Sequence, residues 1–290
     1  MIILCYNAAM ESVAIRAYAK INLTLFITGV QDGYHILDSL VASTDLYDEI
    51  ELRARGDRLI NITMHGEGSE SIPYEGNNAV KAAKLFIEKF KTNGADIVIR
   101  KNIPMGAGLG GSSADAAGVL KGLAKLYNID DTDGINAIAD LTGSDTRYML
   151  YGGWARLFGR GNVIKKIESD FKAHILLLVP EGNISTAQCY SAFDSLGNFG
   201  GNSDMAERAV IERDIKGLAV GLSNSLMPAA ASLSGEIERC IEELKELNPM
   251  AINMTGSGSG VYALFENKQT CALAKSRYNG RARAYISEVK

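Results

Sequence analysis

The chain has 290 residues, of which 47% are hydrophobic and 22% charged, and it carries a formal net charge of −4. This composition is typical of a globular protein with one large domain or two ordinary ones. Because the basic residues are scattered and the net charge is slightly negative, the sequence argues against nucleic acid or an anionic membrane surface as the main partner.

The N-terminal region and the cysteines favour a cytoplasmic protein. The apolar run before Met10 is too short for a signal sequence, no basic segment precedes it, and no later stretch approaches the length of a membrane span. Either Met1 or Met10 could be the true start. Cys5, Cys189, Cys240 and Cys271 lie far apart, with no histidine at ligand spacing, so we expect buried or free thiols and no metal ligands.

In the first half of the chain, short strands alternate with helices. Val80, Ala83, Phe86 and Phe90 recur at helical spacing, and Gly94 is the expected end of that helix. Strands or strand pairs are predicted over 12–30, 34–55, 58–66, 95–103 and 148–161, and helices over 77–94, 112–127 and 132–143.

The second half continues in the same way after a polar, charged stretch over 162–174, where we place the boundary between two domains, 1–163 and 164–290. Residues 197–207 are expected to be a loop, and a glycine loop is expected between the strands of 251–267. Strands are predicted over 174–182, 251–254 and 261–267, helices over 185–196 and up to 247, and a final helix and strand close the chain. The pattern predicts two α+β domains.

The glycine-rich loop before the helix at Ser112 is the first functional candidate. Gly106, Gly108 and Gly111 match the dinucleotide fingerprint G-x-G-x-x-G, but roughly a hundred residues precede them, so that interpretation is poor. The P-loop pattern fails because the chain has no Gly-Lys pair. Two interpretations remain: a serine-capped helix after a flexible loop, or a loop that lets helix-start amides approach a phosphate.

Three ordered motifs decide between them. "PMGAGLGGSSADAAGVL", with "AKINLTL" before it and "MTGSGSGVYALF" near the end, resembles the GHMP small-molecule kinases. Within that family, "AYAKINLTLFITGVQDGYHILDSL" and "STDLYDEIEL" are similar to members that phosphorylate a cytidyl diphosphate alcohol of the non-mevalonate isoprenoid pathway. The resemblance implies a two-domain α+β fold, with an N-terminal domain like ribosomal protein S5 domain 2 and a ferredoxin-like C-terminal domain.

The resemblance also implies a role for each matching residue. Asp145 would accept or orient the proton of the substrate hydroxyl, and Lys20 would stabilise charge in the transition state. Tyr34 would stack on the cytosine ring and His35 would bind its edge, while Asn22 shares a strand face with Lys20. The expected ATP-binding residues are Asn78, Lys101, Pro104, Gly106, Gly108, Leu109, Gly110, Gly111, Ser112 and Ser113. The other expected substrate-binding residues are Asp32, Tyr190, Thr255, Gly256, Ser257 and Gly258.

ATP and Mg²⁺ are the implied cofactors, a small cytidyl diphosphate molecule is the implied partner, and the chain is expected to be a monomer or homodimer. One departure concerns the residues after Asp145, where the family usually has a proline and this chain has Thr146 and Arg147. Arg147 either binds a substrate phosphate or points to solvent. Two alternatives therefore stay open: a GHMP kinase for another small alcohol, and a catalytically silent ligand-binding protein on the same fold.

Overall fold

The structure, a computed structural model, describes residues 12–290. Over these residues the chain forms ten α-helices and twelve β-strands and divides into two compact units. Both units are discontinuous, because β1 (Ser12–Asn22) and β3 (Tyr34–Ala54) each begin in one unit and end in the other. Cys5, Met1 and Met10 lie outside the described residues.

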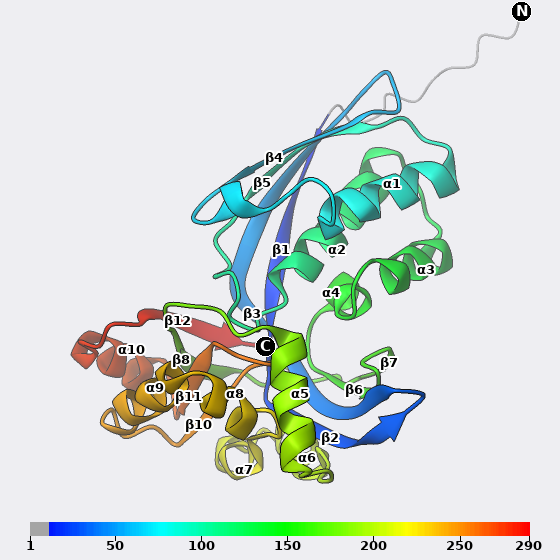
Figure 1. Ribbon diagram of the computed structural model, residues 1–290. Coiled ribbons are helices and arrows are strands. Elements are labelled where there is room, and N and C mark those ends of the chain that lie inside the picture. Colours follow the sequence, from blue (N-terminus) through cyan, green and yellow to red (C-terminus); the bar gives the residue numbers. More distant parts are fainter. Residues whose placement is uncertain (1–11) are drawn as a thin grey trace, which may run out of the picture. The chain divides into compact units, whose positions relative to one another are not determined.

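The first unit contains residues 12–18, 47–103 and 111–151. Its strand β5 pairs in parallel with β4 and antiparallel with the second half of β3. In Figure 1 its four helices lie on one side of these strands. The elements that complete this unit are β4 (Ile60–His65), a 3₁₀ turn (Ser69–Ser71), α1 (Asn78–Phe90), β5 (Ala95–Arg100), α2 (Gly111–Leu126), α3 (Thr132–Thr142) and α4 (Thr146–Tyr151).

Helix α2 packs closely on β3 at two glycines. A Cβ atom on Gly118 would meet Cδ1 of Ile50 at 2.5 Å, and one on Gly122 would meet Cδ1 of Leu52 at 2.3 Å. Both β3 side chains are buried, and burial of one such side chain stabilises the fold by about 1.5–3 kcal/mol. The spacing of these glycines, one helical turn apart, therefore determines how closely α2 approaches the sheet.

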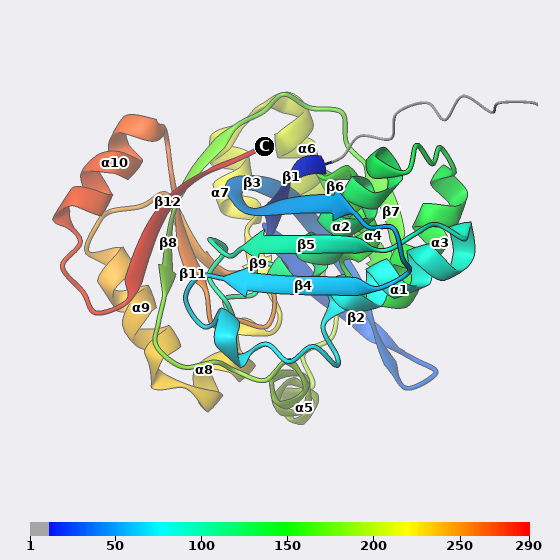
Figure 2. The same ribbon diagram turned by 90° about the horizontal axis from the view of Figure 1, so that it is seen from above.

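The second unit contains residues 19–46, 104–110 and 152–290. Strand β8 lies between β11 and β12, antiparallel to both, and Figure 2 shows α9 and α10 along one side of these strands. A second group of strands forms around the first half of β3, which pairs with β2 and β6. The strands are β2 (Thr24–Gln31), β6 (Ala155–Gly159), β7 (Val163–Lys166), β8 (Ala173–Val179), β9 (Ser223–Asn224), β10 (Ala251–Met254), β11 (Val261–Phe265) and β12 (Arg283–Val289). The helices are α5 (Thr186–Leu196), α6 (Asp204–Glu212), α7 (Ile215–Gly221), α8 (Met227–Leu233), α9 (Gly235–Lys245) and α10 (Lys268–Arg277).

The core of the second unit contains three of the cysteines. Cys189, Cys240 and Cys271 are buried among apolar side chains of the strands and helices, as free thiols. Burial raises the pKa of Cys189 and of Cys271 to about 11, so both thiols stay protonated at neutral pH. The expectation of buried, unpaired cysteines is confirmed for these three residues.

Most predicted elements are confirmed, with three corrections. Residues 148–161 were predicted as a strand pair, but Thr146–Tyr151 forms α4, which buries Tyr148 and Met149 before two glycines end it in the left-handed region. The predicted loop over 197–207 ends early, because α6 begins at Asp204. Helix α1 ends at Phe90 rather than near Gly94, because Lys91 adopts the left-handed conformation.

Candidate active site

The Asp32-Gly33 pair is the turn of a β-hairpin. Gln31 of β2 pairs with Tyr34 of β3, so only two residues connect the strands. Asp32 and Gly33 have φ values of 52° and 76°, the left-handed pair that a two-residue hairpin turn requires. The turn places Tyr34 at the start of β3 with half of its surface exposed.

His35, next to that turn, lies among aromatic side chains of α5. Its ring centroid is 4.7 Å from that of Tyr190 and 6.1 Å from that of Phe193. His35 Nε2 lies 2.6 Å from Oδ1 of Asp194, also on α5. The structure therefore brings together His35 and Tyr190, two of the residues expected to bind the base, and adds Asp194, which sequence reasoning missed.

Tyr34 has a partner that the sequence did not suggest. The guanidinium carbon of Arg160 lies 3.4 Å from the centroid of the Tyr34 ring. Arg160 lies between β6 and β7, and β6 pairs with the first half of β3. The face of an aromatic ring attracts a cation through the ring quadrupole. The positively charged guanidinium of Arg160 therefore covers one face of the exposed Tyr34 ring.

Lys20 and Asn22 form one hydrogen-bonded group with the third glycine loop. Lys20 Nζ donates to Asn22 Oδ1 at 2.5 Å, and the backbone N–H of Gly256 donates to the same oxygen at 3.0 Å. The backbone N–H of Asn22 donates to Oγ1 of Thr255. Lys20 and Asn22 are each 5% exposed, so this network determines where the ammonium group lies.

The loop over 104–110 approaches the loop over 255–260 backbone to backbone. Thr255 Oγ1 donates to the carbonyl oxygen of Gly108, and Ser259 donates its N–H to that of Gly106. A Cβ atom on Gly108 would lie 2.1 Å from the carbonyl oxygen of Thr255. Gly108 also has a φ of 72°, so glycine is required there by both the conformation and the contact. Close approach thus explains part of the glycine content.

In the first unit, three further site candidates gather at the start of α2. Asn78 Nδ2 donates to Oγ of Ser112 at 3.0 Å. Cβ on Gly143, which ends α3, would lie 3.1 Å from Nδ2 of Asn78 and 3.2 Å from Oγ of Ser113. Asp145 follows two residues later in the turn into α4, where its carbonyl oxygen accepts from the N–H of Met149.

Lys101, one of the expected ATP-binding residues, is buried between the acidic side chains of Asp48 and Asp115. Its Nζ donates to Asp48 and, at 2.6 Å, to Asp115 Oδ2. Asp48 also accepts from the backbone N–H groups of residues 102 and 103, and therefore holds the segment after β5. Burial raises the pKa of Asp115 to about 8, although Lys101 opposes the shift. Burial would lower the pKa of Lys101, but attraction to Asp115 and Asp48 outweighs it and raises that pKa.

These shifts predict how pH acts on stability. The folded chain holds a proton on Asp115 up to pH 8, whereas an unfolded aspartate releases it near pH 4. Between these values the free energy of unfolding therefore decreases as pH rises. Asp115→Asn cannot ionise, so we expect a shallower decrease between pH 6 and 8 in urea unfolding. If the free energy of unfolding changed equally with pH in the variant and the wild type, the raised pKa of Asp115 would be contradicted.

Arg147 is at the surface of the first unit. Its guanidinium donates to Oδ2 of Asp140 on α3 at 2.9 Å, and both side chains are about 40% exposed. An ion pair of this exposure contributes at most about 1 kcal/mol. The contact gives Arg147 a partner within its own unit.

The predicted site residues therefore form two sets, one in each unit. The first unit holds Asn78, Lys101, Gly111, Ser112, Ser113 and Asp145. The second holds Lys20, Asn22, Asp32, Tyr34, His35, Pro104, Gly106, Gly108, Leu109, Gly110, Tyr190, Thr255, Gly256, Ser257 and Gly258. Of the latter, Ser257 shares a 2.9 Å hydrogen bond with Thr186 at the start of α5.

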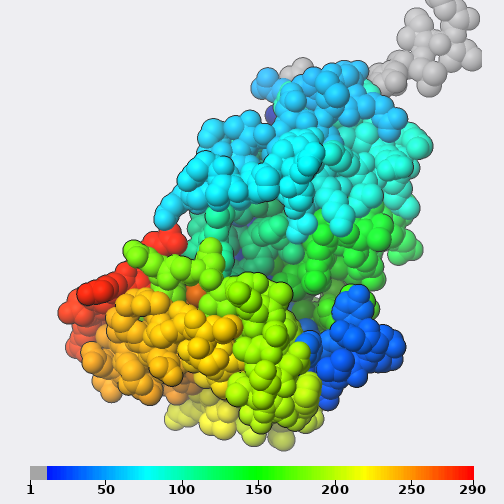
Figure 3. Space-filling model, in the orientation of Figure 1, coloured from blue at the N-terminus to red at the C-terminus, as the bar shows by residue number. Residues whose placement is uncertain are grey.

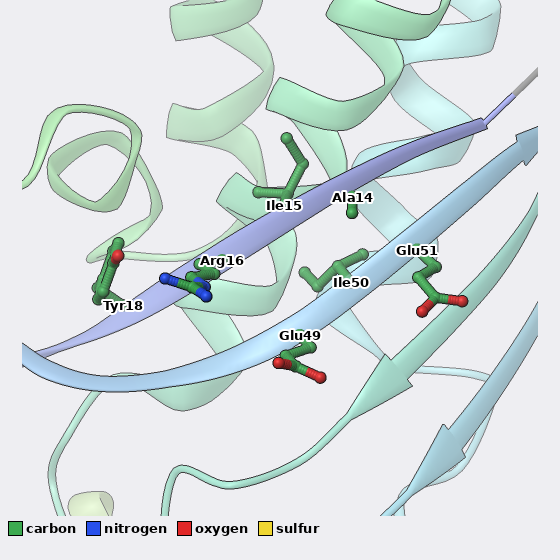
Figure 4. Close-up of a pocket in the computed structure, with 7 residues that line it drawn as sticks. All are labelled: Ala14, Ile15, Arg16, Tyr18, Glu49, Ile50 and Glu51. Atoms are coloured by element: carbon green, nitrogen blue, oxygen red, sulfur yellow. The ribbon is translucent and has the colours of Figure 1, made fainter. Parts of the chain in front are cut away.

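A separate hollow of about 590 Å³ lies in the first unit between β1 and β3. Figure 4 shows Arg16 from β1 and Glu49 and Glu51 from β3 around it. Its lining includes none of the predicted site residues: Ala14, Ile15, Arg16, Tyr18, Glu49, Ile50 and Glu51.

Within residues 12–290, no three histidine, cysteine, aspartate or glutamate side chains lie together so that they could hold a metal ion. In the same part of the chain, no helix is both long and apolar enough to cross a membrane.

Comparison with known proteins identifies the family. The model of the GHMP kinases N terminal domain matches residues 77–153, and that of the GHMP kinases C terminal matches 206–282. The 4-diphosphocytidyl-2-C-methyl-D-erythritol kinase of Acetivibrio thermocellus is 35% identical, covering 96% of this chain and 99% of its own, and that of Clostridium tetani is 36% identical, covering 94% and 99%. A crystal structure of 4-(cytidine 5'-diphospho)-2C-methyl-D-erythritol kinase has a TM-score of 0.81 at 27% identity, covering 96% of this chain and 99% of that one. The chain belongs to the GHMP kinase family of ATP-dependent kinases.

Proposed function

We propose that this chain transfers the γ-phosphoryl group of ATP to the 2-hydroxyl of 4-diphosphocytidyl-2-C-methyl-D-erythritol, a step of the non-mevalonate isoprenoid pathway. The similarity to kinases of this name extends over nearly the whole chain. The observation that supports the substrate most directly is the group formed by His35, Tyr190 and Asp194, a short distance along β3 from the exposed ring of Tyr34. Stacking rings and a hydrogen-bonding imidazole suit a nucleobase better than a simple alcohol.

The start of α2 supports binding of the ATP phosphates. The backbone N–H groups of the first turn, from Gly111 onward, have no acceptor within the helix, and the helix dipole adds a partial positive charge there. Residues 104–110, which include Gly106, Gly108 and Gly110, come directly before this helix in the chain. Asn78 and Ser112 add polar groups beside the first turn. Such an arrangement binds anions.

The proposed chemistry needs Asp145 and Lys20. The substrate hydroxyl loses its proton to the Asp145 carboxylate while its oxygen bonds to the γ-phosphorus, and the bond from phosphorus to ADP breaks. The Lys20 ammonium stabilises negative charge on the phosphoryl oxygens. Asn22 orients that ammonium through its 2.5 Å hydrogen bond.

Mg²⁺ fits the residues of this proposal. The ion keeps several waters and takes one or two protein oxygens beside the substrate phosphates, rather than an all-protein cage. The hydroxyls of Ser112 and Ser113, in the first turn of α2, would supply such oxygens. When bound, Mg²⁺ neutralises phosphate charge.

We further propose that the chain acts in the cytoplasm, as a monomer or homodimer with small-molecule partners alone, and that the boundary between its two family domains lies at residues 163 and 164. Within residues 12–290 the described cysteines are free thiols, in keeping with a reducing compartment.

ADP release tests the proposal. With ATP and Mg²⁺, we expect ADP to form at a rate that depends on added 4-diphosphocytidyl-2-C-methyl-D-erythritol. Homoserine and mevalonate serve as control acceptors, because kinases of both share the fold at 16% identity. Release with a control acceptor alone would favour a GHMP kinase for another alcohol. Binding of ATP without release in any case would favour a silent ligand-binding protein.

A further inference from the structure

We propose that Asp194 is a positioning residue that fixes the tautomer of His35, so that the site selects a cytosine ring over a uracil ring. This inference rests on the proposed function, because it concerns the base of the same substrate. Asp194 lies on α5, and Figure 3 shows the yellow-green segment that contains this helix at the surface of the second unit.

The contact between the two side chains determines where the imidazole hydrogen lies. His35 Nε2 is 2.6 Å from Oδ1 of Asp194, well within hydrogen-bond distance. An ionised carboxylate can only accept, so Nε2 must be the donor. In a neutral imidazole the other nitrogen, Nδ1, then carries no hydrogen and presents a lone pair.

Neighbouring rings hold the imidazole in this orientation. Tyr190 lies against it at a centroid distance of 4.7 Å and an interplanar angle of 40°. Phe193 meets it edge to face at 6.1 Å and is itself buried. The His35 side chain is 19% exposed, so a turn of the ring would require these contacts to change.

A lone pair on Nδ1 distinguishes the two pyrimidines. Cytosine has an amino group at its 4-position, which donates a hydrogen bond, whereas uracil has a carbonyl oxygen there, which accepts. An unprotonated Nδ1 can accept a hydrogen bond from the amino group of cytosine. It cannot bond to the carbonyl oxygen of uracil, because both atoms are acceptors. A polar group left unpaired in a partly closed site reduces affinity, and we expect roughly a 10- to 100-fold preference for cytosine.

Replacement of Asp194 by Asn should change the tautomer with almost no change in shape. The amide NH₂ of asparagine can donate to Nε2, which moves the ring hydrogen to Nδ1. The ring then presents a donor to the base. In Asp194→Asn we expect the ratio of Kd for UDP to Kd for CDP to decrease at least about 10-fold, with KM for ATP unchanged.

Two measurements on the full-length protein test this. The first is calorimetric binding of CDP and UDP to the wild type, Asp194→Asn, Asp194→Glu and the matched control Ser195→Ala, whose site is the next residue of α5. We expect Asp194→Glu to retain at least part of the preference for CDP over UDP. Ser195→Ala should retain all of this preference. For the cytidyl substrate, the Asn variant should raise KM with little change in kcat.

The second measurement is the ¹⁵N NMR spectrum of the imidazole nitrogens at pH 8. The chain has three histidines, and a His35→Gln variant assigns the signals of His35. We expect hydrogen on Nε2 in the wild type and on Nδ1 in Asp194→Asn. An imidazolium or an Nδ1–H form in the wild type overturns the inference, as does an unchanged CDP preference once the tautomer has moved.

The outcomes separate this inference from the proposed function. If the wild type binds CDP and UDP equally yet phosphorylates the cytidyl substrate, the selection by His35 is wrong and the proposed function stands. If it binds neither nucleotide and releases no ADP with the cytidyl substrate, both are wrong.

Discussion

Replacing Asp145 by Asn should lower kcat for phosphorylation by about 100-fold or more, because a positioned base contributes about 10²–10⁴-fold to such reactions. The amide keeps the shape of the carboxylate but cannot accept the proton of the substrate hydroxyl. Asp145 lies in the turn between α3 and α4, where its backbone carbonyl oxygen accepts a hydrogen bond that the substitution leaves in place. We therefore expect folding and ATP affinity to stay nearly normal. Steady-state kinetics measures kcat, calorimetry measures the affinity for ATP, and urea unfolding measures the stability of the fold.

Asp140→Asn is the matched control for this change. Asp140 is a carboxylate of the same unit, near the end of α3, and its partner is Arg147 at the surface. We expect its kcat to differ little from that of the wild type. Turnover of Asp145→Asn within a few-fold of the control would remove Asp145 from the mechanism, and a similar loss in both variants would mean that the unit, and not the base, had been disturbed.

The parts of the fold that the sequence predicted well are those with local patterns. Alternating residues such as those of β5 contain their own structural information over a few positions. Helix α4 was missed because its six residues are too few to show a helical period, and because the two glycines after it resemble a hairpin turn. Burial of Tyr148 by the unit decides its conformation instead.

In the candidate site too, the motifs could be predicted from the sequence, whereas the contacts between distant residues could not. The glycine loops and Lys20 were accessible as motifs, and the structure explains part of their glycine content by the close approach of two backbones near Gly108. The partners of those residues were not accessible. Asp194 is 159 positions from His35, and Asp48 is 53 positions from Lys101, so neither pairing follows from spacing along the chain. Only the folded chain shows that Lys101 bonds to the acidic side chains of both Asp48 and Asp115.

Arg156 is a further buried charge that no motif marked, and it stabilises the second unit. Its guanidinium donates to both carboxylate oxygens of Asp38, at 2.7 Å through Nε, and to Glu207 at 2.8 Å. All three side chains are under 10% exposed. Burial would raise the pKa of Asp38, but hydrogen bonds from Arg156 and Ser203 outweigh it and hold that pKa below its ordinary value. These two ion pairs therefore join β6 to β3 and to α6.

We expect Arg156→Met to destabilise the chain by about 3 kcal/mol or more at pH 7, because loss of one partner leaves a buried charge uncompensated. Glu207 keeps Lys165, and Asp38 keeps Ser203, whose backbone N–H donates to it at 3.4 Å. Urea unfolding measures the change. Asp38→Asn in the Arg156→Met background should recover part of the loss, which a double-mutant cycle quantifies.

Two comparisons make this prediction specific to the buried pair. Arg208→Met removes an exposed partner of Glu212 in the same unit and should change stability little. The low pKa of Asp38 stabilises the wild type above pH 4, and this contribution is lost as pH falls through the folded pKa. The difference between the wild type and Arg156→Met should therefore shrink in acid. A difference that stays constant with pH, or one no larger than that of Arg208→Met, would show that Arg156 acts through packing of its side chain rather than through its charge.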